Sequence, residues 1–224
     1  MEKAAIIDDN RKNRERWGDY VLSIGFDPII YDNPINSLGT LERDLLQNSI
    51  QYALCDHRLN ETYYAPFLGA EAVARMYDKK VSALLITGYQ NSDADTTIRT
   101  YRKKIPVLLK PEEVNKEALR KGFEITYNEI VNKNILPERQ SCKAIMTITD
   151  VIKQGGMNVI KVVLIQWDIN TEVGFPTTML PKKMSKIIKP GQMLLADVNV
   201  DAEKPEDLFF ENFSLPNDEI LRTI

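Results

Sequence analysis

The chain contains few of the residues that most often carry metal or nucleophilic chemistry. Its 224 residues include one histidine, His57, and two cysteines, Cys55 and Cys142. Cysteines so far apart in sequence do not have the spacing of a metal site, and they fit reduced thiols in a reducing compartment. Because residues 140–224 also lack a histidine and a glycine-rich phosphate loop, we expect no independent enzyme in that part of the chain.

Long apolar runs and a strong excess of charge are also missing. No run approaches the roughly 18 apolar residues of a membrane span. The N-terminal stretch MEKAAIIDDN is too short in apolar residues, and too soon interrupted by acids, for a signal peptide. A formal net charge of −3 and a pI near 5.4 give no bulk attraction to nucleic acid or to an anionic membrane. We therefore expect a cytoplasmic protein with no membrane partner.

What is present, in the first 130 residues, is an alternation of short apolar runs with amphipathic stretches. Near-continuous apolar runs are typical of parallel strands that are covered on both faces. Alternating strands and helices favour a doubly wound α/β sheet, in which the carboxyl ends of the strands share one edge. The expected strands are 3–9, 27–32, 51–56, 81–88 and 105–111.

The pattern changes near residues 133–140. A last helix is expected over about 112–133, and Pro137 then interrupts the helical period. Its apolar stripe from Phe123 to Val131 is expected to face the second domain or a second subunit. We place a first domain at 1–133 and a second, all-β domain at 134–224. The second domain has a hairpin signal at 154–158, and we expect a small barrel or half-barrel for it more than a sandwich.

Polar side chains stand where the expected strands end. Asp8 and Asp9 follow the first strand, Asp56 ends the third, Thr87 follows the fourth and Lys110 follows the fifth. Three carboxylates in one place repel one another unless a hard cation joins them, and oxygen ligands favour Mg²⁺. With a lysine and a hydroxyl beside them, these groups are the ones needed for phosphoryl transfer to a carboxylate.

The order IIDD…CD…LLITG…LLKP resembles the receiver domain of two-component response regulators, over residues 3–125. The resemblance implies a flavodoxin-like five-stranded sheet of order 2-1-3-4-5, with Asp56 as the phosphoacceptor. It implies Mg²⁺ held by Asp8, Asp9, Asp56 and the backbone carbonyl of Arg58. It further implies Thr87 as the switch hydroxyl and Lys110 as the lysine that contacts the phosphoryl group.

The sequence departs from the receiver pattern at two places. Val107 stands where receivers usually carry an aromatic switch residue, three positions before the lysine. The segment HRLNETYYAPFLGAE after Asp56 is about five residues longer than usual, so this loop could serve as a lid or a partner surface. Arg58 and Tyr89 are bulky at positions from which they could obstruct an attacking water. We therefore expect the domain to catalyse its own phosphorylation and only slow dephosphorylation.

Other notable residues have simpler interpretations. A single histidine after a strand, as at His57, is more often a loop side chain than a chemical group. The four lysines of 181–190 could contact phosphates, but a solvated strand edge explains them as well. Phe209, Phe210 and Phe213 could form the core of the β-domain or a docking face.

The leading hypothesis is a response regulator of a phosphorelay. A sensor histidine kinase or a phosphotransfer protein would phosphorylate Asp56, and the change would pass to a β-domain that binds a protein partner or self-associates as a homodimer. One alternative is that the β-domain binds nucleic acid. Another is that the first domain stores phosphate while the β-domain is a scaffold.

Overall fold

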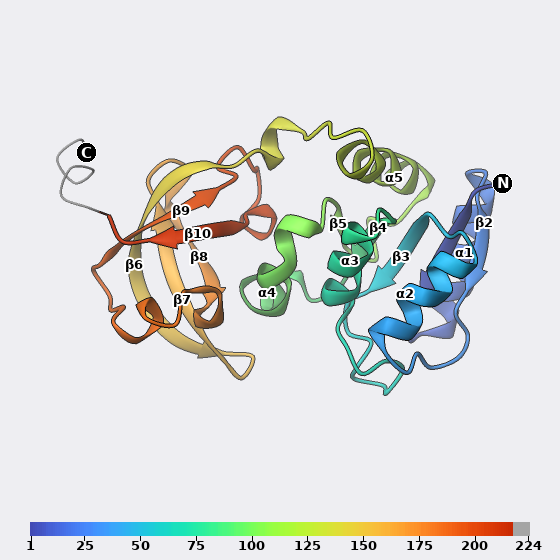
Figure 1. Ribbon diagram of the computed structural model, residues 1–224, viewed down its shortest axis with the longest axis horizontal. Helices are drawn as coiled ribbons and strands as arrows, with labels where there is room; N and C mark the ends of the chain where they lie inside the picture. The colour runs from blue at the N-terminus through green and yellow to red at the C-terminus, as the bar shows by residue number, and fades with distance from the viewer. Residues whose placement is uncertain (217–224) are drawn as a thin grey trace. The chain divides into compact units, whose positions relative to one another are not determined.

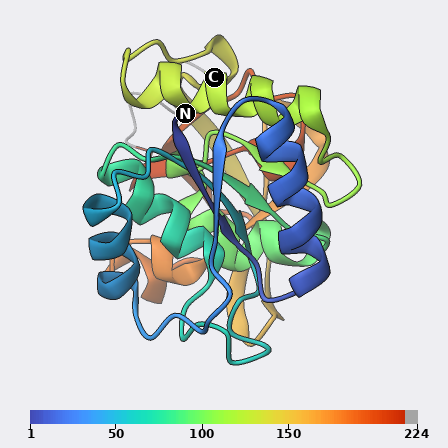
Figure 2. The ribbon, with the colours of Figure 1, turned by 90° about the vertical axis from the view of Figure 1, so that its right-hand side faces the viewer.

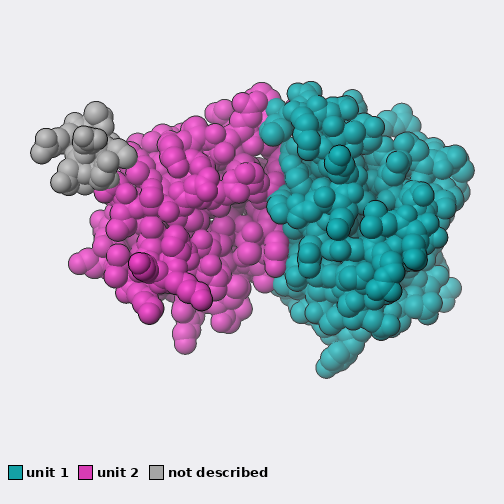
Figure 3. Space-filling view, in the orientation of Figure 1, with its two compact units in different colours: residues 1–88, 104–135 teal, residues 89–103, 136–224 magenta. Residues whose placement is uncertain are grey.

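The computed structural model describes residues 1–216 and divides into two compact units, coloured separately in Figure 3. Unit 1 comprises 1–88 and 104–135, and unit 2 comprises 89–103 and 136–224. The expected limits of 1–133 and 134–224 stay a proposal. No single boundary along the chain separates the two units, because segment 89–103 belongs to the same unit as residues 136–224.

Unit 1 contains a five-stranded parallel sheet (Figure 1). Its order is β2-β1-β3-β4-β5, which confirms the expected flavodoxin-like order 2-1-3-4-5. The strands are nearly all apolar, as parallel strands covered on both faces should be. They are β1 (Lys3–Ile7), β2 (Asp27–Ile30), β3 (Tyr52–Asp56), β4 (Ser82–Ile86) and β5 (Leu108–Leu109).

Four helices cover this sheet, and Figure 2 shows α1 and α2 on opposite sides of it. Side-chain caps begin three of them: Asn10, Ser37 and Asn115 each accept hydrogen bonds from backbone N–H groups of the first turn. The cap at Asn115 makes the last helix start later than the expected residue 112. The helices are α1 (Arg11–Ser23), α2 (Leu38–Gln47), α3 (Gly69–Asp78) and α5 (Lys116–Ile130).

The apolar stripe of α5 is largely used within unit 1. Phe123 is buried in the core with Trp17 and Leu54, and the ring of Tyr127 stacks on Tyr52 of β3 with centroids 6.3 Å apart. The expectation that this stripe faces the second domain or a second subunit is therefore wrong for Phe123, whereas Tyr127 is 37% exposed and its expected role stays a prediction. Gly122 is explained by the same packing, because a Cβ there would lie 2.9 Å from Leu84 Cδ1.

Unit 2 contains a five-stranded antiparallel sheet of order β10-β9-β6-β7-β8, which confirms a second all-β domain. Gly155 and Gly156, both at positive φ, join β6 to β7 as the hairpin signal predicts. Within the described residues β8 and β10 are the edges of this sheet. The strands are β6 (Cys142–Gln154), β7 (Met157–Leu164), β8 (Asp168–Pro176), β9 (Met193–Val198) and β10 (Phe210–Ser214).

The core of unit 2 lies on one face of this sheet. Phe175, Phe210 and Phe213 contact one another there, with the centroids of Phe175 and Phe213 4.9 Å apart. Of the two interpretations of the C-terminal phenylalanines, the core interpretation holds for Phe210 and Phe213.

The stretch between β4 and β5 is helical but irregular. A short α4 (Gln90–Asp93) is followed by a π-helical turn, Ala94–Ile98, and by a 3-10 segment, Arg99–Lys104. π-helical turns are rare and 3-10 runs this long are uncommon, so the segment departs from a regular α-helix. Its buried arginines Arg99 and Arg102 bind groups of unit 2.

Candidate functional site

Asp8 and Asp9 follow β1 and lie at the start of α1. The Asp8 carboxylate is buried, and its Oδ1 accepts a 2.6 Å hydrogen bond from the backbone N–H of Asn10. The carbonyl of Asp8 accepts from Arg14 Nη1 at 2.6 Å. Asp9 is half-buried, and its Oδ2 accepts a 2.8 Å hydrogen bond from the hydroxyl of Thr62. The backbone and a neighbouring loop thus fix both acids.

Asp56 ends β3 in the position that the sequence predicts. Its Oδ2 accepts a 2.7 Å hydrogen bond from the backbone N–H of Arg58. Burial raises the pKa of Asp56 to about 6, against the effect of backbone hydrogen bonds, and the charge of Asp9 adds to the rise. Burial and then the charge of Asp56 raise the pKa of Asp8 to about 7. The two carboxyl groups are therefore close enough to repel each other in a poorly hydrated place.

The strand register brings Thr87 and Lys110 to the same edge. Ile7 pairs with Cys55, Asp56 with Ile86, and Ile86 with Leu109. Asp8 and Asp56 therefore stand in one row, while Thr87 and Lys110 follow one residue further along their strands. Thr87 is buried, and its backbone N–H donates to Leu109 O at 3.0 Å. The backbone N–H of Lys110 donates to Glu113 Oε2 at 2.7 Å.

The long loop after Asp56, residues 57–68, is packed against unit 1. Leu59, Tyr64 and Phe67 are buried. The hydroxyl of Tyr64 donates to the backbone carbonyl of Tyr31. The backbone carbonyl of Tyr64 accepts from the N–H of Ile35 at 2.8 Å. These contacts tie the loop to the segment that follows β2.

Arg58 and Tyr89, the two residues expected to obstruct an attacking water, differ from each other in burial. Arg58 is half-buried, its Nη1 is 2.8 Å from Glu61 Oε1, and its backbone carbonyl accepts from Glu61 N at 3.3 Å. Tyr89 is 54% exposed and is the first residue of unit 2. A role for either in slowing hydrolysis stays a prediction.

Two residues that the sequence did not assign to the site hold its backbone in place. His57 is buried, and its Nδ1 accepts from the backbone N–H of Ala70 at 3.3 Å, which caps α3 where Leu68 cannot. Gly69 lies against Asp56 so closely that a Cβ would be 1.8 Å from the carbonyl oxygen of Asp56. In the sequence, a glycine at the start of the helical pattern GAEAVARMYDKK was the one indication of this close approach.

The acidic residues fit a hard cation only with help from other oxygens. Within residues 1–216, no group of three or more His, Cys, Asp or Glu side chains could hold a metal ion. Mg²⁺ is usually bound through one or two carboxylates and several waters, so such a group is not required. Burial and nearby carboxylates raise the pKa values of Asp8 and Asp56, so a bound cation would favour their charged forms. Carboxylate oxygens of this kind are ligands that fit Mg²⁺.

Segment 89–103, which begins two residues after Thr87, is fixed to the sheet of unit 2 by Arg99. The guanidinium of Arg99 is fully buried, with Nε donating to Gly174 O and Nη2 donating to Pro205 O, both at 3.0 Å. Nη1 donates to Leu208 O, and Nη2 also donates to Asp95 Oδ1 at 3.0 Å. Burial lowers the pKa of Arg99, while the charge of Asp95 acts against that effect.

Further contacts surround this arginine. Lys161 Nζ is 2.5 Å from Asp95 Oδ2, and a Cβ at Gly174 would lie 2.7 Å from that same oxygen. Arg102 Nη2 donates to Asp207 Oδ1 at 2.7 Å. The side chains of the segment thus contact β7, β8 and residues 205–208, all in unit 2.

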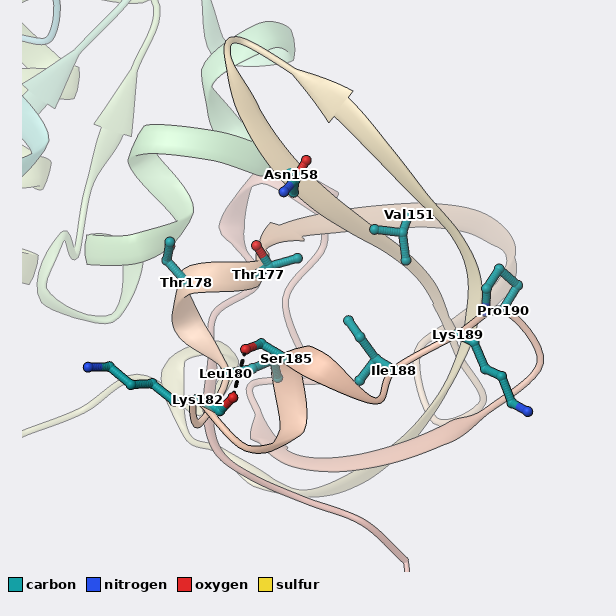
Figure 4. Close-up of a pocket in the computed structure, with 10 residues that line it drawn as sticks. All are labelled: Val151, Asn158, Thr177, Thr178, Leu180, Lys182, Ser185, Ile188, Lys189 and Pro190. Carbon is teal, nitrogen blue, oxygen red and sulfur yellow. Dashed lines mark hydrogen bonds between the residues drawn. The ribbon is translucent and has the colours of Figure 1, made fainter.

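Unit 2 also has a surface hollow of about 720 Å³ beside the lysine-rich stretch 181–190. Figure 4 shows Asn158, Thr177 and Ile188 around it, while Lys182 and Lys189 extend away from it on opposite sides. These two lysines do not converge on one anion site. The hollow therefore adds no support for nucleic-acid binding.

No protein-family model matches the chain, and no curated protein matches it in sequence. Several solved structures of receiver domains resemble it. A response regulator receiver domain from Clostridium thermocellum is 15% identical with a TM-score of 0.45, over 58% of this chain and 96% of that one. The signal receiver domain of a modulated diguanylate cyclase from Desulfovibrio desulfuricans G20 is 18% identical with a TM-score of 0.49, over 60% and 99%. The all-β domain is not identified by these comparisons.

Among the helices within residues 1–216, none has the length and apolar character that crossing a membrane requires.

Proposed function

We propose that the protein is a response regulator whose Asp56 accepts a phosphoryl group from the phosphohistidine of a sensor kinase or a phosphotransfer protein. The observation that carries this proposal is the pairing of Asp8 and Asp56 in a buried place, with pKa values raised to about 7 and about 6. Buried carboxylates that repel each other serve no purpose in stability, and strongly shifted pKa values cluster at functional sites.

The proposed chemistry gives each group of the site a role. A carboxylate oxygen of Asp56 attacks phosphorus, a P–O bond forms, and the P–N bond to the donor histidine breaks, so that the imidazole leaves and takes up a proton. The hydroxyl of Thr87 and the ammonium of Lys110 would donate to the phosphoryl oxygens. Mg²⁺, held by Asp8, Asp9, Asp56, the Arg58 carbonyl and water, would neutralise charge on the phosphoryl group.

The test is phosphorylation by a small acyl phosphate in the presence of Mg²⁺, followed by intact mass. We expect one added phosphoryl group in the wild type, stable in acid and labile in base, and none in Asp56→Asn, because an amide is not a usable nucleophile. Asp19→Asn, at an exposed aspartate of α1, is the matched control and should behave as wild type. Label retained in full by Asp56→Asn would refute the assignment of the acceptor.

The output would pass through segment 89–103. This segment starts two residues after Thr87, and Arg99 and Arg102 bind it to backbone and carboxylate groups of unit 2. A rearrangement of Thr87 around a phosphoryl group would pull on the segment that supports β8 and residues 205–208. The β-domain would then change its affinity for a protein partner or for a second copy.

Hydrogen exchange before and after phosphorylation tests this route. We expect changes in 168–176 and 205–211, where the segment is bound. Phosphorylation of Asp56 with unchanged exchange throughout 136–216 would favour the phosphate-storage alternative.

A further inference from the structure

The long loop after Asp56 carries one hydroxyl onto the acidic site. Thr62 Oγ1 donates to Asp9 Oδ2 at 2.8 Å, between residues 53 positions apart in the chain. We propose that Thr62 is a positioning residue, which orients the Asp9 carboxylate toward a Mg²⁺ ion bound at Asp8 and Asp56. The inference rests on the proposed function of that site.

The loop around Thr62 is built to hold this position. Backbone N–H of Ala65 donates to Leu59 O at 3.0 Å and closes the turn that contains Thr62. On one side of it Leu59 is buried, and on the other Tyr64 and Ala65 are buried. The hydroxyl is thus presented by a packed turn.

The backbone beside Thr62 also has an unfavourable conformation. Tyr63 has φ of +59° and is 92% exposed. A bulky residue in the left-handed region costs free energy and persists where the surrounding structure compels it. Tyr64 is buried on one side of Tyr63, and Thr62 donates to Asp9 on the other. Both neighbours of Tyr63 are therefore held by contacts of their own.

The hydrogen bond has a consequence for cation binding. The hydrogen bond to Oδ2 restricts rotation of the whole Asp9 carboxylate and does not itself occupy Oδ1. Groups that orient a metal's ligands in this way typically contribute about 10–100-fold to its affinity. Because Thr62 is exposed and Asp9 only half-buried, we expect the lower end of that range here. Binding is reciprocal, so the cation should also make the loop more ordered.

The experiment is calorimetric titration of Mg²⁺ into the full chain. Thr62→Val keeps the shape and removes the hydroxyl, whereas Thr62→Ser keeps the hydroxyl. Thr171→Val is the matched control, because Thr171 donates to an aspartate in the same way, 2.6 Å from Asp168 Oδ2, but in unit 2. We expect about 10-fold weaker binding in Thr62→Val. Thr62→Ser and Thr171→Val should bind as the wild type does.

A second measurement separates positioning from a general loss of structure. Mg²⁺ should slow amide hydrogen exchange in residues 59–66 of the wild type and of Thr62→Ser, and this effect should be lost in Thr62→Val. Unchanged Mg²⁺ affinity in Thr62→Val overturns the inference and leaves the proposed function standing. A wild-type protein that binds no Mg²⁺ overturns both.

Discussion

Replacing Arg99 with methionine should destabilise unit 2 and leave unit 1 nearly unchanged. Methionine fills part of the same space but cannot donate hydrogen bonds. The carbonyls of Gly174, Pro205 and Leu208 would lose a common donor, and Asp95 would keep only Lys161. The perturbation is confined to groups that belong to one compact unit.

The size of the effect follows from burial. The Arg99 side chain is 0% exposed, so water cannot replace the lost donors without opening the structure. Removing one partner from a buried, hydrogen-bonded ion pair typically costs about 3–5 kcal/mol. At a urea slope of about 2 kcal/mol per molar, a loss of this size moves the unfolding midpoint of unit 2 down by about 2 M.

The two tryptophans provide the assay, because each unit contains one. Trp17 is buried in unit 1, and Trp167 lies in unit 2 with its Nε1 donating to Ala202 O at 2.7 Å. Arg99→Met is measured in a Trp17→Phe background for unit 2 and in a Trp167→Phe background for unit 1, each against its own parent. The control Lys103→Met removes a half-exposed ion pair with Glu211 from the same segment and should cost less than about 1 kcal/mol.

Two results would refute this reasoning. If Arg99→Met leaves the Trp167 transition in place, the arginine does not bind the segment to the sheet in solution. If both tryptophans report equal losses, segment 89–103 supports unit 1 as much as unit 2, and its assignment to unit 2 is wrong.

Two further predictions concern unit 1. The folded-state pKa values of Asp8 and Asp56, about 7 and about 6, lie above the ordinary 3.8. The folded state therefore binds more protons than the unfolded state. The free energy of unfolding should fall as pH rises from about 4 to 7. Urea titrations at pH 5 and pH 8 without divalent cations should show this, and higher stability at pH 8 would contradict it. Gly69→Ala should lower the free energy of unfolding by about 3 kcal/mol or more, because its Cβ would overlap the carbonyl oxygen of Asp56. The control Gly39→Ala, whose Cβ would have no neighbour nearer than 4.0 Å, should change it little. Circular dichroism during urea unfolding measures both variants.

The acidic edge was predictable because it depends on strand order alone. In a parallel sheet each strand's last residues meet at one edge, so the position of Asp8, Asp56, Thr87 and Lys110 directly after apolar runs was enough to group them. The distribution of charge among them was not predictable, because the raised pKa values depend on burial that the sequence does not state.

The role of segment 89–103 could not be read from the sequence for a different reason. Its local pattern, DADTTIRTYRKK, is amphipathic and predicts an ordinary helix. The partners of Arg99 are backbone carbonyls 75, 106 and 109 positions away. Carbonyls are present at every residue, so no residue type in the strands marks where an arginine will bind. The capping role of His57 was missed for the same reason, since its Nδ1 accepts from a backbone N–H, that of Ala70.

The position of this segment also changes which part of the chain could link phosphorylation to the β-domain. The sequence favoured the last helix, yet Phe123 and Tyr127 of α5 pack within unit 1. A switch requires a differential interaction with its output, and a side chain buried in its own unit, as Phe123 is, has little of it to offer a second domain. Segment 89–103 has the opposite distribution: both of its ends continue into unit 1, at residues 88 and 104, while its buried arginines bind unit 2. Under the proposed function, a rearrangement at Thr87 would therefore reach those arginine contacts along the backbone of residues 88–98.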